Sequence, residues 1–180
     1  IYQLDTARWG IGKDVHPASV VSVGGRFGYE DDGQTPNTQV SLYDYGDVQI
    51  IQEVRGLDTA KYPPDLSMGN IFECENGKLV ISIAGSAAYA PSGELIQRFG
   101  GAGEHFRNFT DAVKSRKRAD LNSEVLDGHL STALCHLANV SYRLGETKAA
   151  GDLGKALTTD AAHEAGDRLV GHLKENGVDV

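Results

Sequence analysis

The feature that most constrains the fold is a change of hydrophobic period near residue 100. In residues 18–99 short runs of alternating β-branched and polar side chains are separated by turn residues such as Gly46-Asp47 and Asn76-Gly77. A period of two is typical of half-buried strands, and two-residue links between such runs indicate hairpins. We therefore expect an antiparallel meander of about six strands in this region.

Beyond residue 103 the apolar residues recur at helical spacing instead. An earlier helix is predicted over residues 1–12, where Leu4, Arg8 and Ile11 share one face and Gly10 and Gly12 end it. Helices are expected over residues 1–12, 104–117 and 124–144, with a weaker one over residues 161–175.

Strands followed by helices predict an α+β fold, with an open, mostly antiparallel sheet of about six strands and helices packed on one face. The second face of such a sheet meets water or a partner chain. Tyr43, Tyr45 and either Ile50 or Ile51 alternate onto that face. We therefore expect a homodimer or homotetramer formed through the sheet.

Composition excludes several classes of function. The 180 residues, 40% of them hydrophobic, suffice for one domain with a core, and the net charge of −8 makes a nucleic-acid partner a poor fit. Two cysteines, Cys74 and Cys135, allow neither a disulfide framework nor a four-thiolate zinc site. No apolar run approaches the ~20 residues of a membrane span, so no membrane partner is expected. We expect a cytoplasmic protein, with export left open because the chain starts at Ile1.

The glycine-rich stretches do not form a phosphate cradle. Gly101-Ala102-Gly103 lies between a strand and a helix, but Phe106 stands where a dinucleotide motif needs its third glycine. A tight turn explains this stretch. The glycines between Gly24 and Gly28 lie inside extended sequence, where they indicate a bulge or a close approach of two backbones. The pair Pro63-Pro64 predicts a loop.

Titratable side chains give weaker signals. His129 and His136 share one edge of the helix expected over residues 124–144. Two interpretations are open: both are half-buried, hydrogen-bonded histidines, or they face a cleft in which His129 contacts a polar ligand. No metal site is expected, because no third ligand is placed beside them. From their positions near turns and helix edges, the candidate substrate-binding residues are Arg26, Tyr29, Asp31, Gln34 and His129. Asp31 is equally explained as a turn-capping residue.

Three stretches together resemble a known family. They are Tyr2-Gln3-Leu4-Asp5-Thr6-Ala7-Arg8-Trp9-Gly10, then Gly24-Gly25-Arg26-Phe27-Gly28-Tyr29 with the polar turn after it, and then Gly103-Glu104-His105-Phe106-Arg107-Asn108-Phe109 with Gly128-His129-Leu130-Ser131. This combination resembles the C-terminal domain of the glucose–fructose oxidoreductase / inositol dehydrogenase / rhizopine catabolism (Gfo/Idh/MocA) family over about residues 1–145. Residues 146–180 do not match and are expected to form a polar, partly helical tail.

The resemblance implies a two-domain parent protein. In that family an N-terminal Rossmann domain binds NAD or NADP and carries a Glu-Lys-Pro motif, and the C-terminal α/β domain is an open antiparallel sheet that builds a dimer or tetramer. Nothing precedes Ile1 in this sequence, so the Rossmann domain is absent from the chain. No NAD or NADP is therefore expected to bind these residues alone, and no cofactor-binding residue is assigned.

The resemblance also singles out Tyr2. Dehydrogenase members carry an Asp-x-x-x-His pair at the start of the helix that joins the domains, and its histidine moves the proton of the sugar hydroxyl. In the alignment with this sequence, Tyr2 occupies the position of that histidine, and some members of the family have tyrosine there. A lysine cation beside a phenol favours the phenolate, which lets it act as acid or base. The alternative is a tyrosine that packs at a frayed helix end.

The function implied is that of a C-terminal substrate-binding and oligomerisation domain of an NAD(P)-dependent oxidoreductase, inactive alone. The substrate class is a sugar, cyclitol or related polyol. One alternative is an NAD-dependent glycosidase of the same family, in which transient oxidation enables loss of the aglycone. The other is a non-catalytic binding or dimerisation module.

Overall fold

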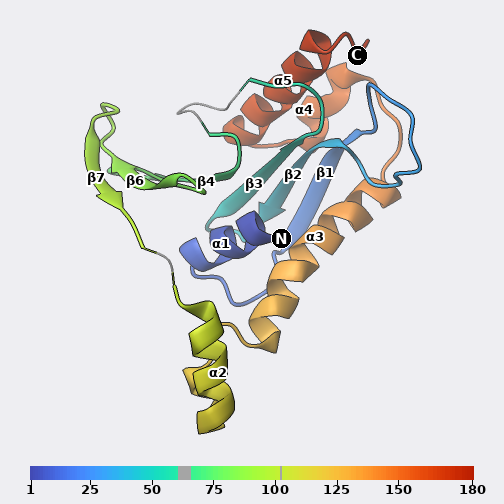
Figure 1. The fold of residues 1–180 in the computed structure, drawn as a ribbon. Coiled ribbons are helices and arrows are strands. Elements are labelled where there is room, and N and C mark those ends of the chain that lie inside the picture. Colours follow the sequence, from blue (N-terminus) through green and yellow to red (C-terminus); the bar gives the residue numbers. More distant parts are fainter. Residues whose placement is uncertain (61–65, 102) are drawn as a thin grey trace. The chain divides into compact units, whose positions relative to one another are not determined.

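The computed structural model describes residues 1–60, 66–101 and 103–180, and the loop expected at Pro63-Pro64 lies outside the described residues. Figure 1 shows the elements along the chain. The strands are β1 (Ser19–Gly25), β2 (Thr38–Asp44), β3 (Gln49–Arg55), β4 (Gly69–Cys74), β5 (Gly77–Ser82), β6 (Gly85–Tyr89) and β7 (Leu95–Phe99). The α-helices are α1 (Tyr2–Gly10), α2 (His105–Ser115), α3 (Val125–Leu144), α4 (Leu153–Ala156) and α5 (Asp160–Glu175).

The α+β class and the antiparallel pairing are confirmed, but the strands divide into two sheets. One has the order β1-β2-β3 and the other β4-β5-β6-β7. The hairpins expected at Gly46-Asp47 and Asn76-Gly77 join β2 to β3 and β4 to β5. The connection from Gly56 to Met68 is much too long for a hairpin turn, and β3 and β4 are not paired with each other.

The chain forms two compact units, each built around one sheet. The first unit consists of Ile1–Asp14 and Lys61–Thr132, and it holds β4–β7. The second unit consists of Val15–Ala60 and Ala133–Val180, and it holds β1–β3. The predicted boundary at residue 145 stays a prediction.

The core of the second unit lies where α5 packs on β2 and β3. β2 is the central strand, and every residue of it except Asp44 is buried. Val40 and Leu42 of β2 cluster with side chains from α5 and the segment before it, namely Leu157, Ala162, Ala165, Leu169 and Leu173. Residues 146–180, expected to be a polar tail, therefore supply much of this core.

Helix α3 lies beside β1, an edge strand of the three-stranded sheet. The backbone N–H of Ser22 in β1 donates to Ser141 Oγ of α3 at 3.0 Å. Tyr43 of β2 is fully buried, and its hydroxyl donates to Gln52 at 2.7 Å. Tyr43 and Ile50 were expected to be available to a partner chain, and the structure buries both.

In the first unit α1 packs against β4. The backbone at Gly10 lies so close to Phe72 that a Cβ there would come within 2.1 Å of the ring, and Asn70 donates to the carbonyl of Gln3 at 2.7 Å. The far edge strand, β7, has all five residues exposed. α2 is amphipathic, yet none of its residues is buried, and Phe106 and Phe109 lie largely in solvent.

Among the described residues, no helix has both the length and the apolar character that crossing a membrane would require.

Candidate active site around the first helix

The first helix presents Tyr2 to solvent. Tyr2 is the first residue of α1 and is 82% exposed, and its carbonyl accepts a hydrogen bond from Thr6 Oγ1 at 3.0 Å. The phenol is thus accessible to a small molecule. Asp5 lies three residues after Tyr2 and three before Arg8, so it neighbours both on the surface of α1. Tyr2 and Arg8 themselves lie about 120° apart around the helix.

Arg8 is the largest fully buried side chain that the structure describes. Its Nε donates to Ser131 Oγ at 3.0 Å, and Nη1 donates to the carbonyl of Lys13 at 3.0 Å and to Asp14 at 3.1 Å. Nη2 donates to Asp127 at 3.3 Å and lies 3.7 Å from Asp5. Each nitrogen of this buried cation therefore has an acceptor or an anion, which offsets the cost of removing it from water.

Local sequence explains how α3 meets this arginine. Asp127 and Ser131 are four residues apart and so lie on one side of α3, near its start. The Ser131 hydroxyl accepts from Arg8 and donates to the Asp5 carboxylate, while Asp127 also accepts the backbone N–H of Glu124 at 3.3 Å. We call Arg8, Asp5, Asp127 and Ser131 the arginine bracket.

His129 does not belong to the arginine bracket. It is exposed, and it lies two residues from Asp127 and from Ser131 along α3, which turns it about 200° from both of them. The structure therefore points His129 to the other side of the helix. Its assignment as a substrate-binding residue stays a prediction.

The other predicted residues lie in the second unit, in the loop between β1 and β2. Arg26 pairs with Asp31, donates to the carbonyl of Thr35 at 2.6 Å, and has its guanidinium 5.9 Å from the centre of the Tyr29 ring. Asp31 also accepts the backbone N–H of Gly33 at 2.8 Å, as a turn-capping aspartate does. Gln34 accepts from Arg143 at 3.3 Å. Arg26, Tyr29 and Asp31 are thus brought together, and their polar groups largely satisfy one another.

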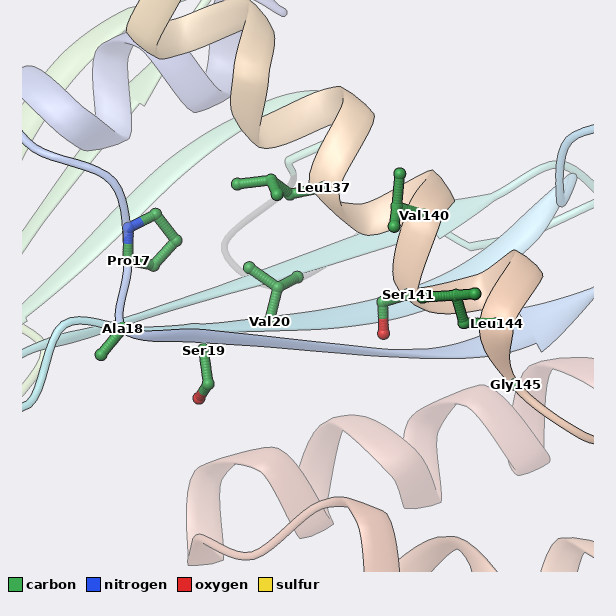
Figure 2. Close-up of a pocket in the computed structure, with 9 residues that line it drawn as sticks. All are labelled: Pro17, Ala18, Ser19, Val20, Leu137, Val140, Ser141, Leu144 and Gly145. Atoms are coloured by element: carbon green, nitrogen blue, oxygen red, sulfur yellow. The ribbon is translucent and has the colours of Figure 1, made fainter.

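The second unit also contains an apolar groove between β1 and α3. Figure 2 shows Leu137 and Val140 of α3 beside Val20 of β1, with Leu144 further along the helix. The groove has a volume of about 380 Å³, and the polar side chains on its wall are the hydroxyls of Ser19 and Ser141. It contains no titratable group and none of the predicted residues, so it offers no acid or base.

Sequence periodicity missed the arginine bracket, although a signal for it was present. Arg8 occupies a position in the apolar row of α1, beside Leu4. A charged residue in such a row indicates a buried ion pair, because an unpaired buried charge is very costly. Its partners could not be found in this way, since Asp127 and Ser131 lie more than a hundred residues further along the chain.

The described residues do not fit a nicotinamide dinucleotide. Such a cofactor binds at a glycine-rich turn between a parallel strand and a helix. Here the element before α2 is β7, an antiparallel edge strand, and the N-cap residue of α2, Glu104, makes no side-chain capping bond. Nor does the described part of the chain contain a group of three or more side chains suited to a metal ion.

Comparison with known proteins gives likeness of fold and not of sequence. No protein-family model matches the chain, and no curated protein does. A putative oxidoreductase from Thermotoga maritima superimposes with a TM-score of 0.61 at 16% identity, over 79% of this chain and 43% of that one. A putative oxidoreductase from Klebsiella pneumoniae gives 0.56 at 13% identity, over 95% of this chain and 52% of that one.

A third solved structure, a putative oxidoreductase from Bacteroides fragilis, gives a TM-score of 0.51 at 14% identity, over 79% of this chain and 47% of that one. This chain therefore spans about half the length of these solved chains. Identities this low establish the fold alone: the chain has the fold of one part of several solved proteins described as putative oxidoreductases.

Proposed function

We propose that this chain is the C-terminal, substrate-binding and oligomerisation part of an NAD(P)-dependent oxidoreductase of the Gfo/Idh/MocA type, acting on a sugar, cyclitol or related polyol. One observation carries the proposal. Two of the stretches that resemble the family, residues 2–10 and 128–131, are far apart in sequence and are joined in space by the hydrogen bond from Arg8 to Ser131. The likeness of fold to half of several putative oxidoreductases supports it.

In this proposal Tyr2 moves the proton of the substrate hydroxyl. Its phenol is exposed at the first residue of α1, where a substrate can reach it. NAD or NADP would supply the hydride acceptor, and the resemblance assigns its binding to a preceding Rossmann domain. The described residues do not cradle a dinucleotide, so the 180-residue chain alone is expected to be inactive.

The proposed partner is a second copy of the chain, bound through the four-stranded sheet. β7 is an edge strand, and Leu95, Ile96 and Phe99 are all exposed on it. Exposed apolar edge strands pair readily with other chains, so natural proteins seldom leave them uncovered. The three-stranded sheet packs against α5, and α3 lies beside its edge strand β1, so we assign the assembly to β4–β7.

The test is a turnover assay on the reading frame that contains Ile1 together with everything encoded upstream of it. Reduction of NAD or NADP is followed by absorbance over a panel of hexoses, pentoses, inositols and uronic acids. Tyr2→Phe is expected to lower kcat by a factor of about 10² or more, because a positioned acid–base group contributes that much. Tyr142→Phe, a tyrosine of α3 in the second unit, serves as the matched control and is expected to leave turnover unchanged.

Three outcomes separate the candidate functions. Net reduction of the cofactor with one of the polyols supports the dehydrogenase. Release of the aglycone from an aryl glycoside without net reduction would identify the glycosidase instead. If the protein from the whole reading frame shows neither activity, the non-catalytic binding module is supported. Turnover by residues 1–180 alone would contradict the expected inactivity of this chain.

A further inference from the structure

Helix α1 is too short to be stable by itself. It has nine residues, and its N-cap, Ile1, makes no side-chain capping bond. Isolated helices shorter than about 12 residues are marginal in water, so tertiary contacts must fix α1. The residues that α1 buries are Leu4, Ala7 and Arg8. Of these, Arg8 alone makes directional bonds through its side chain.

The bonds of Arg8 reach three separate pieces of the first unit. Nε reaches Ser131 in α3, Nη1 reaches the carbonyl of Lys13 in the loop after α1, and Nη2 reaches Asp127 in α3. The pair with Asp14 adds little, because the side chain of Asp14 is 89% exposed. The planar guanidinium thus ties α1 to α3 at two points on one side and to the following loop on the other.

We propose that Arg8 is a positioning residue, and that the arginine bracket holds α1 against α3 so that the phenol of Tyr2 occupies one orientation. This inference rests on the proposed function of Tyr2. Because Arg8 is fully buried, it cannot contact a substrate in solution directly. It also lies six residues, or about 9 Å along the helix, beyond Tyr2. It therefore acts through the helix and not on the reacting atoms.

A lysine at position 8 would not replace the arginine. An ammonium group is a compact charge and lacks the planar fork that reaches Ser131, Lys13 and Asp127 together. Arg8→Lys is thus expected to keep a positive charge near Asp5 and Asp127 while losing the fixed geometry. Ser131→Ala is the milder variant, since it removes the two hydrogen bonds that Ser131 makes with Arg8 and Asp5 of α1 and leaves the ion pairs in place.

The experiment measures α1 and catalysis separately. Hydrogen exchange on the 180-residue chain follows the amides of α1, whose exchange in Arg8→Lys is expected to rise at least about tenfold. In the enzyme produced from the whole reading frame, Arg8→Lys is expected to lower kcat at least about tenfold and to leave KM within about twofold of the wild-type value. The reason is that an orienting interaction is lost while substrate binding is kept. Ser131→Ala is expected to change both in the same direction by less.

Two matched variants test whether general destabilisation explains these changes. Arg107→Lys alters an exposed arginine of α2 that pairs with Glu104 and Asp111, and no change in α1 or in kcat is expected. Arg168→Lys weakens the bond of Arg168 to Glu53 in the second unit. It is expected to lower the unfolding temperature without raising exchange in α1 or lowering kcat of the folded enzyme.

The inference fails if Arg8→Lys leaves the exchange of α1 and kcat unchanged, or if Arg168→Lys lowers kcat equally at the same loss of stability. Tyr2→Phe distinguishes this failure from failure of the proposed function. That variant should lower kcat by a factor of about 10² or more and leave the exchange of α1 as in the wild type. Full turnover by Tyr2→Phe would overturn the role of Tyr2, whereas the exchange data would still show whether the bracket holds α1.

Discussion

His172 is a buried histidine on α5 with one ring nitrogen that has no hydrogen-bond partner among the described residues. Its Nδ1 lies 3.5 Å from the amide of Asn176, and Nε2 is the nitrogen without a partner. Burial lowers the pKa of His172 from its ordinary 6.5, and the positive charge of Arg55 on β3 lowers it further, against a smaller opposite effect of Glu175. The folded chain therefore favours the neutral form of this imidazole over the protonated one.

Stability is expected to fall as the pH drops below about 6.5, because His172 takes up its proton more readily in the unfolded chain than in the folded one. The contribution of the neutral imidazole is complete above the unfolded pKa and is lost as the pH falls toward the lower folded value. Urea unfolding between pH 8 and pH 5 measures this. His172→Leu should flatten the pH dependence relative to His163→Leu, and an equal slope in the two variants would contradict the assignment.

At single positions the sequence predicted backbone features better than side-chain partners. The close approach expected near Gly24 is confirmed, since a Cβ at Gly24 would lie 2.2 Å from the carbonyl oxygen of Thr38 on β2. Glycine is recognisable there because it interrupts a β-branched run. The partners of Arg8 in α3 were not recognisable, because a pairing between distant residues leaves no local pattern in either segment.

At the scale of elements, α5 is the helix whose packing the sequence understated. Leu169 is buried against β2 and β3, so Leu169→Ala is expected to lower the free energy of unfolding by about 2–5 kcal/mol. Leu144→Ala at the exposed end of α3 is the matched control, with an expected change within about 0.5 kcal/mol. Chemical denaturation compares the two, and equal effects would mean that α5 is not part of the core.

Element positions could largely be predicted, and packing could not. The helix expected over residues 124–144 is α3, Val125–Leu144, because its leucines repeat with a clear helical period. The C-terminal segment looked polar because its buried positions include small residues, Ala162 and Ala165, which give a weak hydrophobic signal. The division into two sheets could not be predicted either, because alternation indicates strands without saying which of them pair.

For the whole molecule we expect a dimer in solution at micromolar concentration, formed through β4–β7. Ile96 is 62% exposed on β7, and a lysine there would place a charge in the proposed interface. Ile96→Lys is therefore expected to give the monomer mass in light scattering, whereas Leu144→Lys, on the exposed end of α3, should keep the dimer mass. A wild-type chain that is strictly monomeric would refute the proposed assembly.

The division of the chain between the two units limits how it can be cut into fragments. Each unit is made of two separate stretches, and α3 contributes its first turns to one unit and the rest to the other. Neither unit can be cut out of the gene as one continuous piece. A continuous fragment that keeps one sheet therefore either lacks part of its own unit or includes part of the other.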